Sequence, residues 1–179
     1  PSVKWKNIDV GAGYYYITGT ITEWLPLLRY AEIRQRVCDD IAVALMDCGG
    51  SLAAFVIMPD HLHLLIYLPC EGQLHKFNKL WRGRSGRHIP KILTNLAADD
   101  SLAVLAAHAK RGCQYGVWKE QVRALAMWST PKLLAKIDYI HNNPARRGLV
   151  EHPADWPHSS YRFYESGTRT CLDVTPIEP

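Results

Sequence analysis

The chain has 179 residues, a formal net charge of +4, 47% hydrophobic and 21% charged residues, which excludes wholesale disorder and favours one globular domain. Its longest apolar run, 52–58, is much shorter than the roughly 20 residues of a membrane-spanning helix. Five cysteines without C-x-x-C spacing argue against a disulfide framework or a zinc ribbon, so we expect a cytoplasmic protein with no membrane partner.

The first half of the chain predicts a strand, a helix and a β-hairpin. The segment 14–22 is rich in aromatic and β-branched residues, which favour strands. Apolar residues recur at helical spacing over 27–47, and a Gly-Gly pair ends that helix. The runs 52–58 and 61–68 are short and apolar, and a Pro-Asp turn joins them, so we expect two paired strands.

The second half predicts helices and one further strand. A helix is expected over 73–84, followed by a helical insertion around 83–112 that contains loop and short helices. The segment 114–127 contains the fourth strand. A helix over 130–142 begins with Thr-Pro, which suits a first turn, and ends before a proline. The tail after residue 150 is expected to wrap the domain.

The order of these elements indicates the fold class. It is β-α-β-β-α-β-α, which is typical of an α+β protein with a ferredoxin-like βαββαβ sandwich and an additional C-terminal helix and tail. No internal repeat or low-complexity segment divides the sequence. We therefore predict a single domain over 1–179.

A basic stretch lies in the middle of the chain. No acidic residue occurs between Glu71 and Asp99, whereas lysines and arginines recur throughout the interval. Such a stretch suits a polyanionic partner, and a solvated basic helix face explains it equally well. The candidate contacts to a polyanion in this stretch, such as DNA, are Lys76, Lys79, Arg82, Arg84 and Arg87.

Two histidines open the second strand of the hairpin. Side chains alternate between the faces of a strand, so His61 and His63 point the same way. Two imidazoles on one face suit a divalent metal ion. The H-x-H pattern alone is more often a pair of surface or hydrogen-bonded histidines.

The last helix carries a candidate nucleophile. Tyr139 lies off the apolar face of this helix, on a flank shared with Lys136 and Asn143, which is one turn later. A phenol, a polar ligand and a cation suit attack on a phosphodiester near a metal ion. A half-buried packing tyrosine is the commoner interpretation of a lone tyrosine. Arg146 and Arg147 follow as further candidate DNA contacts.

Several segments give the sequence a specific resemblance. They are MPDHLHLL at 58–65, YIHNNPARRGLV at 139–150 and PADWPHSSY at 153–161, together with Trp118. In this order they resemble the REP-associated tyrosine transposases, within the HUH single-strand transposase superfamily. The landmarks span most of the chain.

The resemblance implies a fold and a site. The fold would be the HUH nuclease fold, with His61 and His63 as metal ligands and Asn143 completing the metal site. Tyr139 would be the catalytic nucleophile that forms a 5′-phosphotyrosine and frees a 3′-OH. The metal would be Mg²⁺ or Mn²⁺, and the partner a DNA hairpin with adjacent single strand.

We therefore predict a metal-dependent, single-stranded-DNA endonuclease and strand transferase that acts on hairpin-type, REP-like DNA. Two alternatives stay open. One is a domesticated protein that binds hairpin DNA without cutting it. The other is a metal-dependent hydrolase in which water, not Tyr139, attacks. Monomer and homodimer are both compatible with the sequence.

Overall fold

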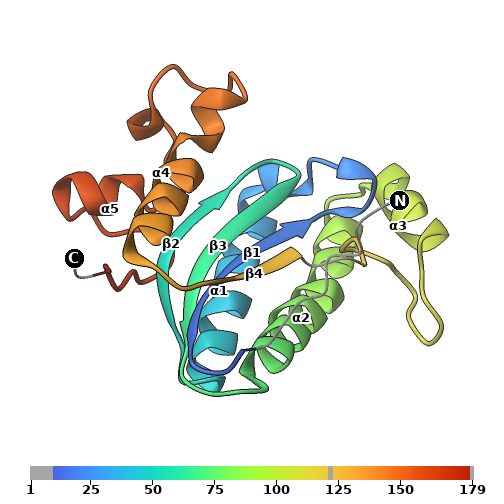
Figure 1. Ribbon diagram of the computed structural model, residues 1–179. Coiled ribbons are helices and arrows are strands. Elements are labelled where there is room, and N and C mark those ends of the chain that lie inside the picture. The colour runs from blue at the N-terminus through green and yellow to red at the C-terminus, as the bar shows by residue number, and fades with distance from the viewer. Residues whose placement is uncertain (1–9, 121–122, 178–179) are drawn as a thin grey trace, which may run out of the picture.

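The computed structural model describes residues 10–120 and 123–177. Figure 1 shows these residues folded around one sheet, with helices on both sides of it. In chain order the elements are β1 (Gly13–Thr20), η1 (Thr22–Trp24), η2 (Leu27–Arg29), α1 (Ala31–Asp47), β2 (Ser51–Ile57), β3 (His61–Leu68), α2 (Gln73–Asn95), α3 (Asp99–Ala107), β4 (Arg123–Met127), α4 (Thr130–Arg146), η3 (Pro153–Asp155) and α5 (Tyr161–Ser166).

The described residues form a four-stranded sheet in the order β2-β3-β1-β4, and every neighbouring pair is antiparallel. This strand order and the βαββαβ succession confirm the predicted ferredoxin-like α+β fold. The two central strands, β1 and β3, are therefore joined to neighbours on both sides. Their side chains have fixed positions on the two faces of the sheet.

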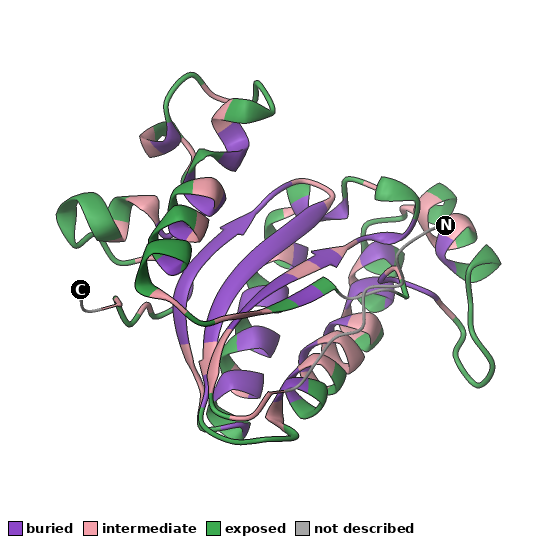
Figure 2. Ribbon diagram, in the orientation of Figure 1, coloured by how far each residue is buried: buried purple, intermediate pink, exposed green. Residues whose placement is uncertain are grey.

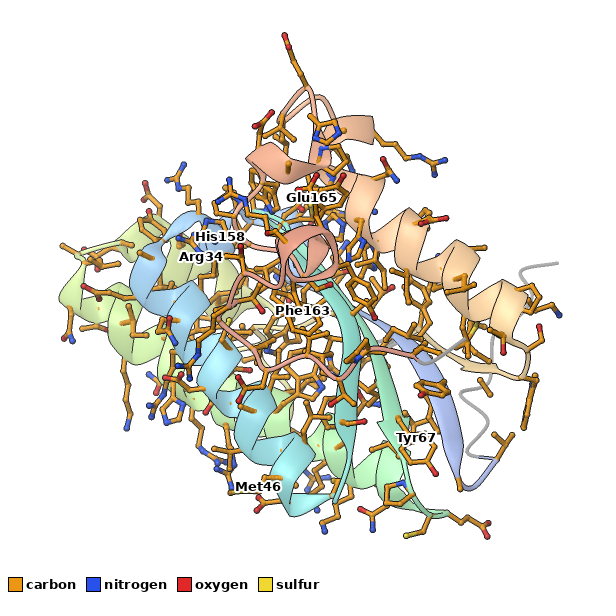
Figure 3. The ribbon with its side chains drawn as sticks, turned by 90° about the vertical axis from the view of Figure 1, so that its left-hand side faces the viewer. Arg34, Met46, Tyr67, His158, Phe163 and Glu165 are labelled. Atoms are coloured by element: carbon orange, nitrogen blue, oxygen red, sulfur yellow. The ribbon has the colours of Figure 1, made fainter. Side chains whose placement is uncertain are left out.

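The two faces of the sheet have different covers. Alternate residues of β3, such as Leu62, Leu64 and Ile66, pack with α1 and α2 in the larger core. The opposite face packs against α4 through Leu133, Ile137 and Ile140 in a smaller apolar cluster. Figure 3 shows the sheet between these layers, and Figure 2 shows β2 and β3 buried along most of their length. One part of the second face is left open beside α4.

Helix α2 is longer than the sequence suggested. The predicted end near Arg84 is wrong, because α2 continues to Asn95 through two glycines and Pro90. An interior glycine costs about 1 kcal/mol relative to alanine, and proline costs more. Burial of Trp81, Ile89 and Leu93 against the core offsets this cost. Much of the expected insertion is thus the second half of one helix.

Helix α4 also continues past its expected end. Pro144 lies inside the helix, which ends at Arg146, so the predicted stop before this proline is wrong. The backbone N–H of Arg147 donates to the carbonyl of Asn143 at 3.1 Å, which continues the helical pattern beyond the proline. Asn143 therefore keeps its place one helical turn after Tyr139. The predicted start of the first helix at residue 27 is also wrong, because α1 begins at Ala31 and a 3₁₀ turn precedes it.

The chain after α4 runs along β2, an edge strand of the sheet. The backbone N–H of Ile57 donates to the carbonyl of His158 at 2.8 Å. The backbone N–H of Ser160 donates to the carbonyl of Phe55 at 3.0 Å. Further along, Thr175 donates to the carbonyl of Leu52 at 2.8 Å. This cover satisfies backbone groups that an exposed edge would offer to another chain. Within the described residues, no helix has the length and apolar character needed to cross a bilayer.

Gly19 of β1 lies directly against Trp81 of α2. A Cβ added at Gly19 would lie 2.6 Å from Cη2 of Trp81, a fully buried side chain. Gly19 sits between Thr18 and Thr20, whose side chains face the open part of the sheet. Because Gly19 has no side chain, the Trp81 indole packs directly against β1 on the face of the sheet opposite Thr18 and Thr20.

We expect Gly19→Ala to destabilise the fold by about 1–3 kcal/mol, because overpacking at a rigid neighbour forces the strand or Trp81 to move. Gly13→Ala is the matched control on the same strand, because an added Cβ there meets nothing within 4 Å. Urea unfolding followed by circular dichroism measures both. Equal midpoints for the two variants would mean that the contact with Trp81 does not constrain β1.

Candidate active site

The open part of the second sheet face forms a pocket of about 680 Å³ beside α4. β1 and β3 supply its floor, and α4 supplies one wall. The residues that line it include those selected from the sequence as metal ligands and nucleophile. These residues are His61, His63, Tyr139 and Asn143.

The β1–β3 register places the two histidines on the pocket floor. Thr18 is opposite His63, and Thr20 is opposite His61, so these four side chains share one face. The imidazole rings of His61 and His63 are 4.9 Å apart, and both residues are buried. The predicted common orientation of the two histidines is therefore present.

His63 is held by two hydroxyl groups of β1. Its Nδ1 lies 2.8 Å from the Tyr16 hydroxyl and 3.0 Å from the Thr18 hydroxyl. Burial lowers the pKa of His63 to about 3, and the neighbouring His61 ring and the Lys136 ammonium act in the same direction. The ring is therefore neutral at physiological pH. With its Nδ1–H donated to a hydroxyl oxygen, Nε2 has a lone pair for a ligand.

His61 is held by the turn that precedes β3. Its Nδ1 lies 2.5 Å from a carboxylate oxygen of Asp60. Burial lowers the pKa of His61, and this effect exceeds the opposing effect of Asp60. A neutral His61 donates its Nδ1–H to Asp60 and keeps the Nε2 lone pair. A carboxylate behind an imidazole is the usual arrangement that orients a metal-binding histidine.

Asn143 is the third side chain suited to a metal ion. It is buried and lines the same pocket from α4. Within residues 10–120 and 123–177 no cluster of three His, Cys, Asp or Glu side chains is arranged to hold a metal. A site here would therefore combine two imidazole nitrogens with the amide oxygen of Asn143. Such a set fits a divalent ion that keeps open positions for water or phosphate oxygens.

Tyr139 is half-buried, and its ring approaches His63 with 5.7 Å between ring centroids. The Lys136 ammonium lies over this ring at 4.8 Å, and the Arg146 guanidinium lies 5.7 Å from it. The helical position of Lys136, one turn before Tyr139, produces the first contact. A phenol with cations beside it can stabilise negative charge as it develops on the oxygen.

Tyr16 is a second phenol in the pocket. Its ring is 6.2 Å from that of Tyr139, and Lys136 lies 4.2 Å above it. Burial raises the pKa of Tyr16 well above its usual range, so its hydroxyl keeps its proton. Tyr16 was not among the site residues selected from the sequence. Its alternation with Thr18 on β1 is the signal that places it beside His63.

Other pocket residues were not selected from the sequence. Lys119 and Arg123 line the pocket together with the predicted Lys136 and Arg147. The Lys119 ammonium lies 4.7 Å above the ring of Trp24, an exposed aromatic side chain at the rim. Arg123 is opposite Thr18 in the β1–β4 register, so strand alternation would have placed it on this face once β4 was known.

The basic residues of α2 lie elsewhere, because α2 covers the opposite face of the sheet. Lys76 donates to the carbonyl of Asp47, and Arg84 forms an ion pair with the Asp47 carboxylate at 3.1 Å. Arg82 donates to the carbonyl of Lys119. Arg82 and Arg87 line a separate groove of about 820 Å³, together with two other cations, Lys91 and Lys110. Lys79 is exposed on the same helix.

Comparisons with known proteins place the chain among transposases. A family model described as IS200-like transposase matches residues 25–102, a range that includes both histidines and ends before α4. An Escherichia coli REP-associated tyrosine transposase is 30% identical over 141 residues, which cover 79% of this chain and 67% of that protein. A Haemophilus influenzae protein assigned to the same group is 27% identical over 109 residues, 60% of this chain and 57% of its own.

A solved structure supports the same fold. It shows a REP-associated tyrosine transposase bound to a REP hairpin, with a TM-score of 0.63 and 20% identity. The superposition covers 97% of this chain and 94% of that one. In contrast, the matched segments span little more than half to two thirds of the Haemophilus and Escherichia proteins. By its identity to the Escherichia protein and the share of both chains that is matched, this chain belongs to the REP-associated tyrosine transposase family.

Proposed function

We propose that this chain is a divalent-metal-dependent endonuclease and strand transferase for single-stranded DNA, with Tyr139 as its nucleophile. One observation carries the proposal: the Tyr139 phenol shares a pocket with two neutral histidines that are held through Nδ1. A tyrosine that serves only to pack the core needs no such neighbours. Family membership supports the same activity.

The reaction is a transfer of the phosphodiester to tyrosine. The Tyr139 oxygen attacks phosphorus, the bond from phosphorus to the 3′-oxygen breaks, and the phenolic proton is lost to solvent. The leaving 3′-oxygen takes up a proton and becomes a 3′-OH. The product is a 5′-phosphotyrosine, which conserves the bond for later attack by a 3′-OH. Water as nucleophile would give hydrolysis only.

The chain's own cations position the phosphate. Lys136, Arg123 and Arg147 line the pocket from two sides and offset the charge of the substrate. Lys136 also lies over the Tyr139 ring, so it stabilises the phenolate as it forms. Burial lowers the pKa of Lys136, which is consistent with a cation partly shielded from water.

His61, His63 and Asn143 would hold Mn²⁺ or Mg²⁺, and imidazole nitrogens favour the former. When bound, the ion would polarise a nonbridging phosphate oxygen and stabilise the leaving oxygen. The role of Asp60, Tyr16 and Thr18 would be to keep the two imidazoles in the required tautomer and orientation.

We propose hairpin DNA with an adjacent single strand as the substrate. The relative of known structure is bound to a REP hairpin, and the pocket here carries both cations and an exposed Trp24 at its rim. Bases of a single strand stack on aromatic side chains, whereas paired bases do not offer their faces. We still predict that the basic residues of α2 contact a longer DNA.

The first prediction separates the two phenols of the pocket. Tyr139→Phe should reduce formation of the covalent DNA adduct by a factor on the order of 10³ or more, because the nucleophilic oxygen is gone. Tyr16→Phe should still form the adduct, about 10–100-fold more slowly, because it removes only a hydrogen bond to His63. The assay uses labelled hairpin DNA, Mn²⁺ and denaturing electrophoresis.

Mass spectrometry of the trapped adduct should place the nucleotide on the peptide with Tyr139. An adduct on Tyr16, or full cleavage by Tyr139→Phe without any adduct, would show that the nucleophile has been assigned incorrectly. Binding of uncut hairpin DNA by both variants serves as the control for folding.

The second prediction concerns the carboxylate behind His61. Asp60→Asn should weaken Mn²⁺ binding about 10–100-fold, because an amide, unlike a carboxylate, can donate its N–H to Nδ1 and so stabilise the tautomer that lacks the Nε2 lone pair. Asp155→Asn, in the 3₁₀ turn after α4, is the matched control and should leave the affinity unchanged. Calorimetric titration of the protein with Mn²⁺ measures this without DNA. Equal affinities for the two variants would mean that Asp60 does not orient His61 for the metal.

The third prediction compares two basic surfaces by their salt dependence. Each lost phosphate contact flattens the slope of log K against log salt by about 0.7 for a single strand. Replacing Lys136 and Arg147 with glutamine should flatten it by about 1.4 for a short single strand. Replacing Lys79 and Arg87 with glutamine should flatten this slope only for a longer hairpin DNA. If that slope stays unchanged, the α2 residues are not DNA contacts.

A further inference from the structure

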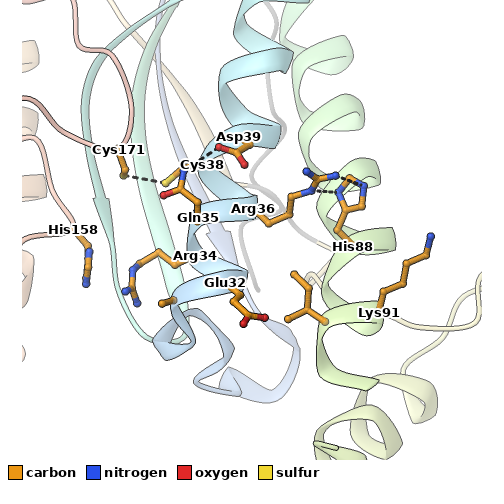
Figure 4. Close-up of a pocket in the computed structure, with 12 residues that line it drawn as sticks. Glu32, Arg34, Gln35, Arg36, Cys38, Asp39, His88, Lys91, His158 and Cys171 are labelled. Carbon is orange, nitrogen blue, oxygen red and sulfur yellow. Dashed lines mark hydrogen bonds between the residues drawn. The ribbon is translucent and has the colours of Figure 1, made fainter. Parts of the chain in front are cut away.

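A third hollow, of about 760 Å³, lies outside the active-site pocket, between α1, α2 and the C-terminal tail. Cys38 from α1 and Cys171 from the tail meet in it, as Figure 4 shows. Their sulfur atoms are 2.9 Å apart, with the Cys38 thiol as donor, although the residues are 133 positions apart in sequence. A disulfide bond is about 2.05 Å long, so only a small movement separates the thiols from bonding distance.

We propose that Cys38 and Cys171 form a redox-active thiol pair, in which a hydroperoxide oxidises Cys171 and Cys38 then closes a disulfide that ties the tail to α1. The proposal is independent of the DNA chemistry. A reducing cytoplasm keeps such a pair as thiols, so the disulfide would form only when peroxide is present.

The two steps balance without any other reactant. The Cys171 thiolate attacks one peroxide oxygen, the O–O bond breaks, and Cys171 becomes a sulfenic acid while hydroxide leaves. The Cys38 sulfur then attacks the sulfenic sulfur, the S–O bond breaks, and water leaves with the Cys38 proton. Two thiols and one hydrogen peroxide thus give one disulfide and two water molecules.

The surroundings assign different roles to the two sulfurs. Cys171 is exposed and open to a small oxidant, whereas Cys38 is buried beneath it. The hydrogen bond from Cys38 lowers the pKa of the Cys171 thiol, and the nearby Arg34 charge acts in the same direction. The same bond and burial raise the pKa of Cys38. Arg34 and His158 lie next to each other at this hollow (Figure 3).

The position of Cys171 gives the disulfide a structural consequence. The adjacent Leu172 is buried in the larger core, and Thr175 is hydrogen-bonded to Leu52 of the edge strand β2. A Cys38–Cys171 bond would therefore fasten the tail at the point where it covers the sheet. Loss of the tail would expose backbone groups of β2.

The test uses the full chain with Cys70→Ser and Cys113→Ser, which removes the other exposed thiols and leaves buried Cys48 as an internal control. After treatment with hydrogen peroxide, non-reducing digestion at basic residues and at aspartates separates Cys38 from Cys48. Mass spectrometry should find one linkage, between the peptides with Cys38 and Cys171, and dithiothreitol should reverse it. In the Cys38→Ser variant, dimedone should instead label Cys171 as a sulfenic acid.

The rate of oxidation provides a second measurement on the unmodified chain. Peroxide should consume the Cys171 thiol about 10-fold faster than the exposed thiols of Cys70 and Cys113, because a lower pKa gives more thiolate. Proteolysis after Arg169 should release the tail from the reduced protein and leave it attached in the oxidised protein. Equal oxidation rates for the three thiols, or oxidation of Cys171 without a link to Cys38, would overturn the proposal.

Discussion

The antiparallel register between β1 and β3 is the constraint on which the pocket depends. It sets Thr18 opposite His63 and Thr20 opposite His61, and it brings the Tyr16 hydroxyl to His63 Nδ1. A shift of one residue would turn both histidines into the apolar core, where neither a ligand nor a substrate could reach them. The core itself prevents that shift, because the intervening residues, such as Leu62, are fully buried. Packing on one face of the sheet thus fixes the positions of the histidines on the other face.

The electrostatics of the pocket follow from the same burial. Two imidazoles close together among lysines and arginines would repel those cations if they were protonated. Burial lowers the pKa of both rings, so neutral histidines lie beside Lys136, Arg123 and Arg147, which line the same pocket. A metal ion and a phosphate would then each meet the groups that suit them.

Much of the fold and part of the site were predictable from the sequence. Strand alternation was enough to place His61 and His63 on one face of the sheet. Helical spacing was enough to place Lys136 and Asn143 on the same flank of the helix as Tyr139. Local signals failed where tertiary packing overrides them, as when buried Trp81 and its neighbours carry α2 through two glycines and a proline. The roles of Tyr16 and Asp60 depend on pairings between distant segments, which no local pattern contains.

The position of Tyr139 depends on the tail as well as on the sheet. His141, two residues later in α4, is buried and lies with Nε2 2.8 Å from the Ser160 hydroxyl. That hydroxyl also accepts the backbone N–H of Phe55 at 2.9 Å, so one serine joins α4, the tail and β2. Burial lowers the pKa of His141 to about 4, which keeps the ring neutral in this contact. The edge strand is therefore covered by the same segment that holds the tyrosine helix against the sheet, and the two cannot move independently.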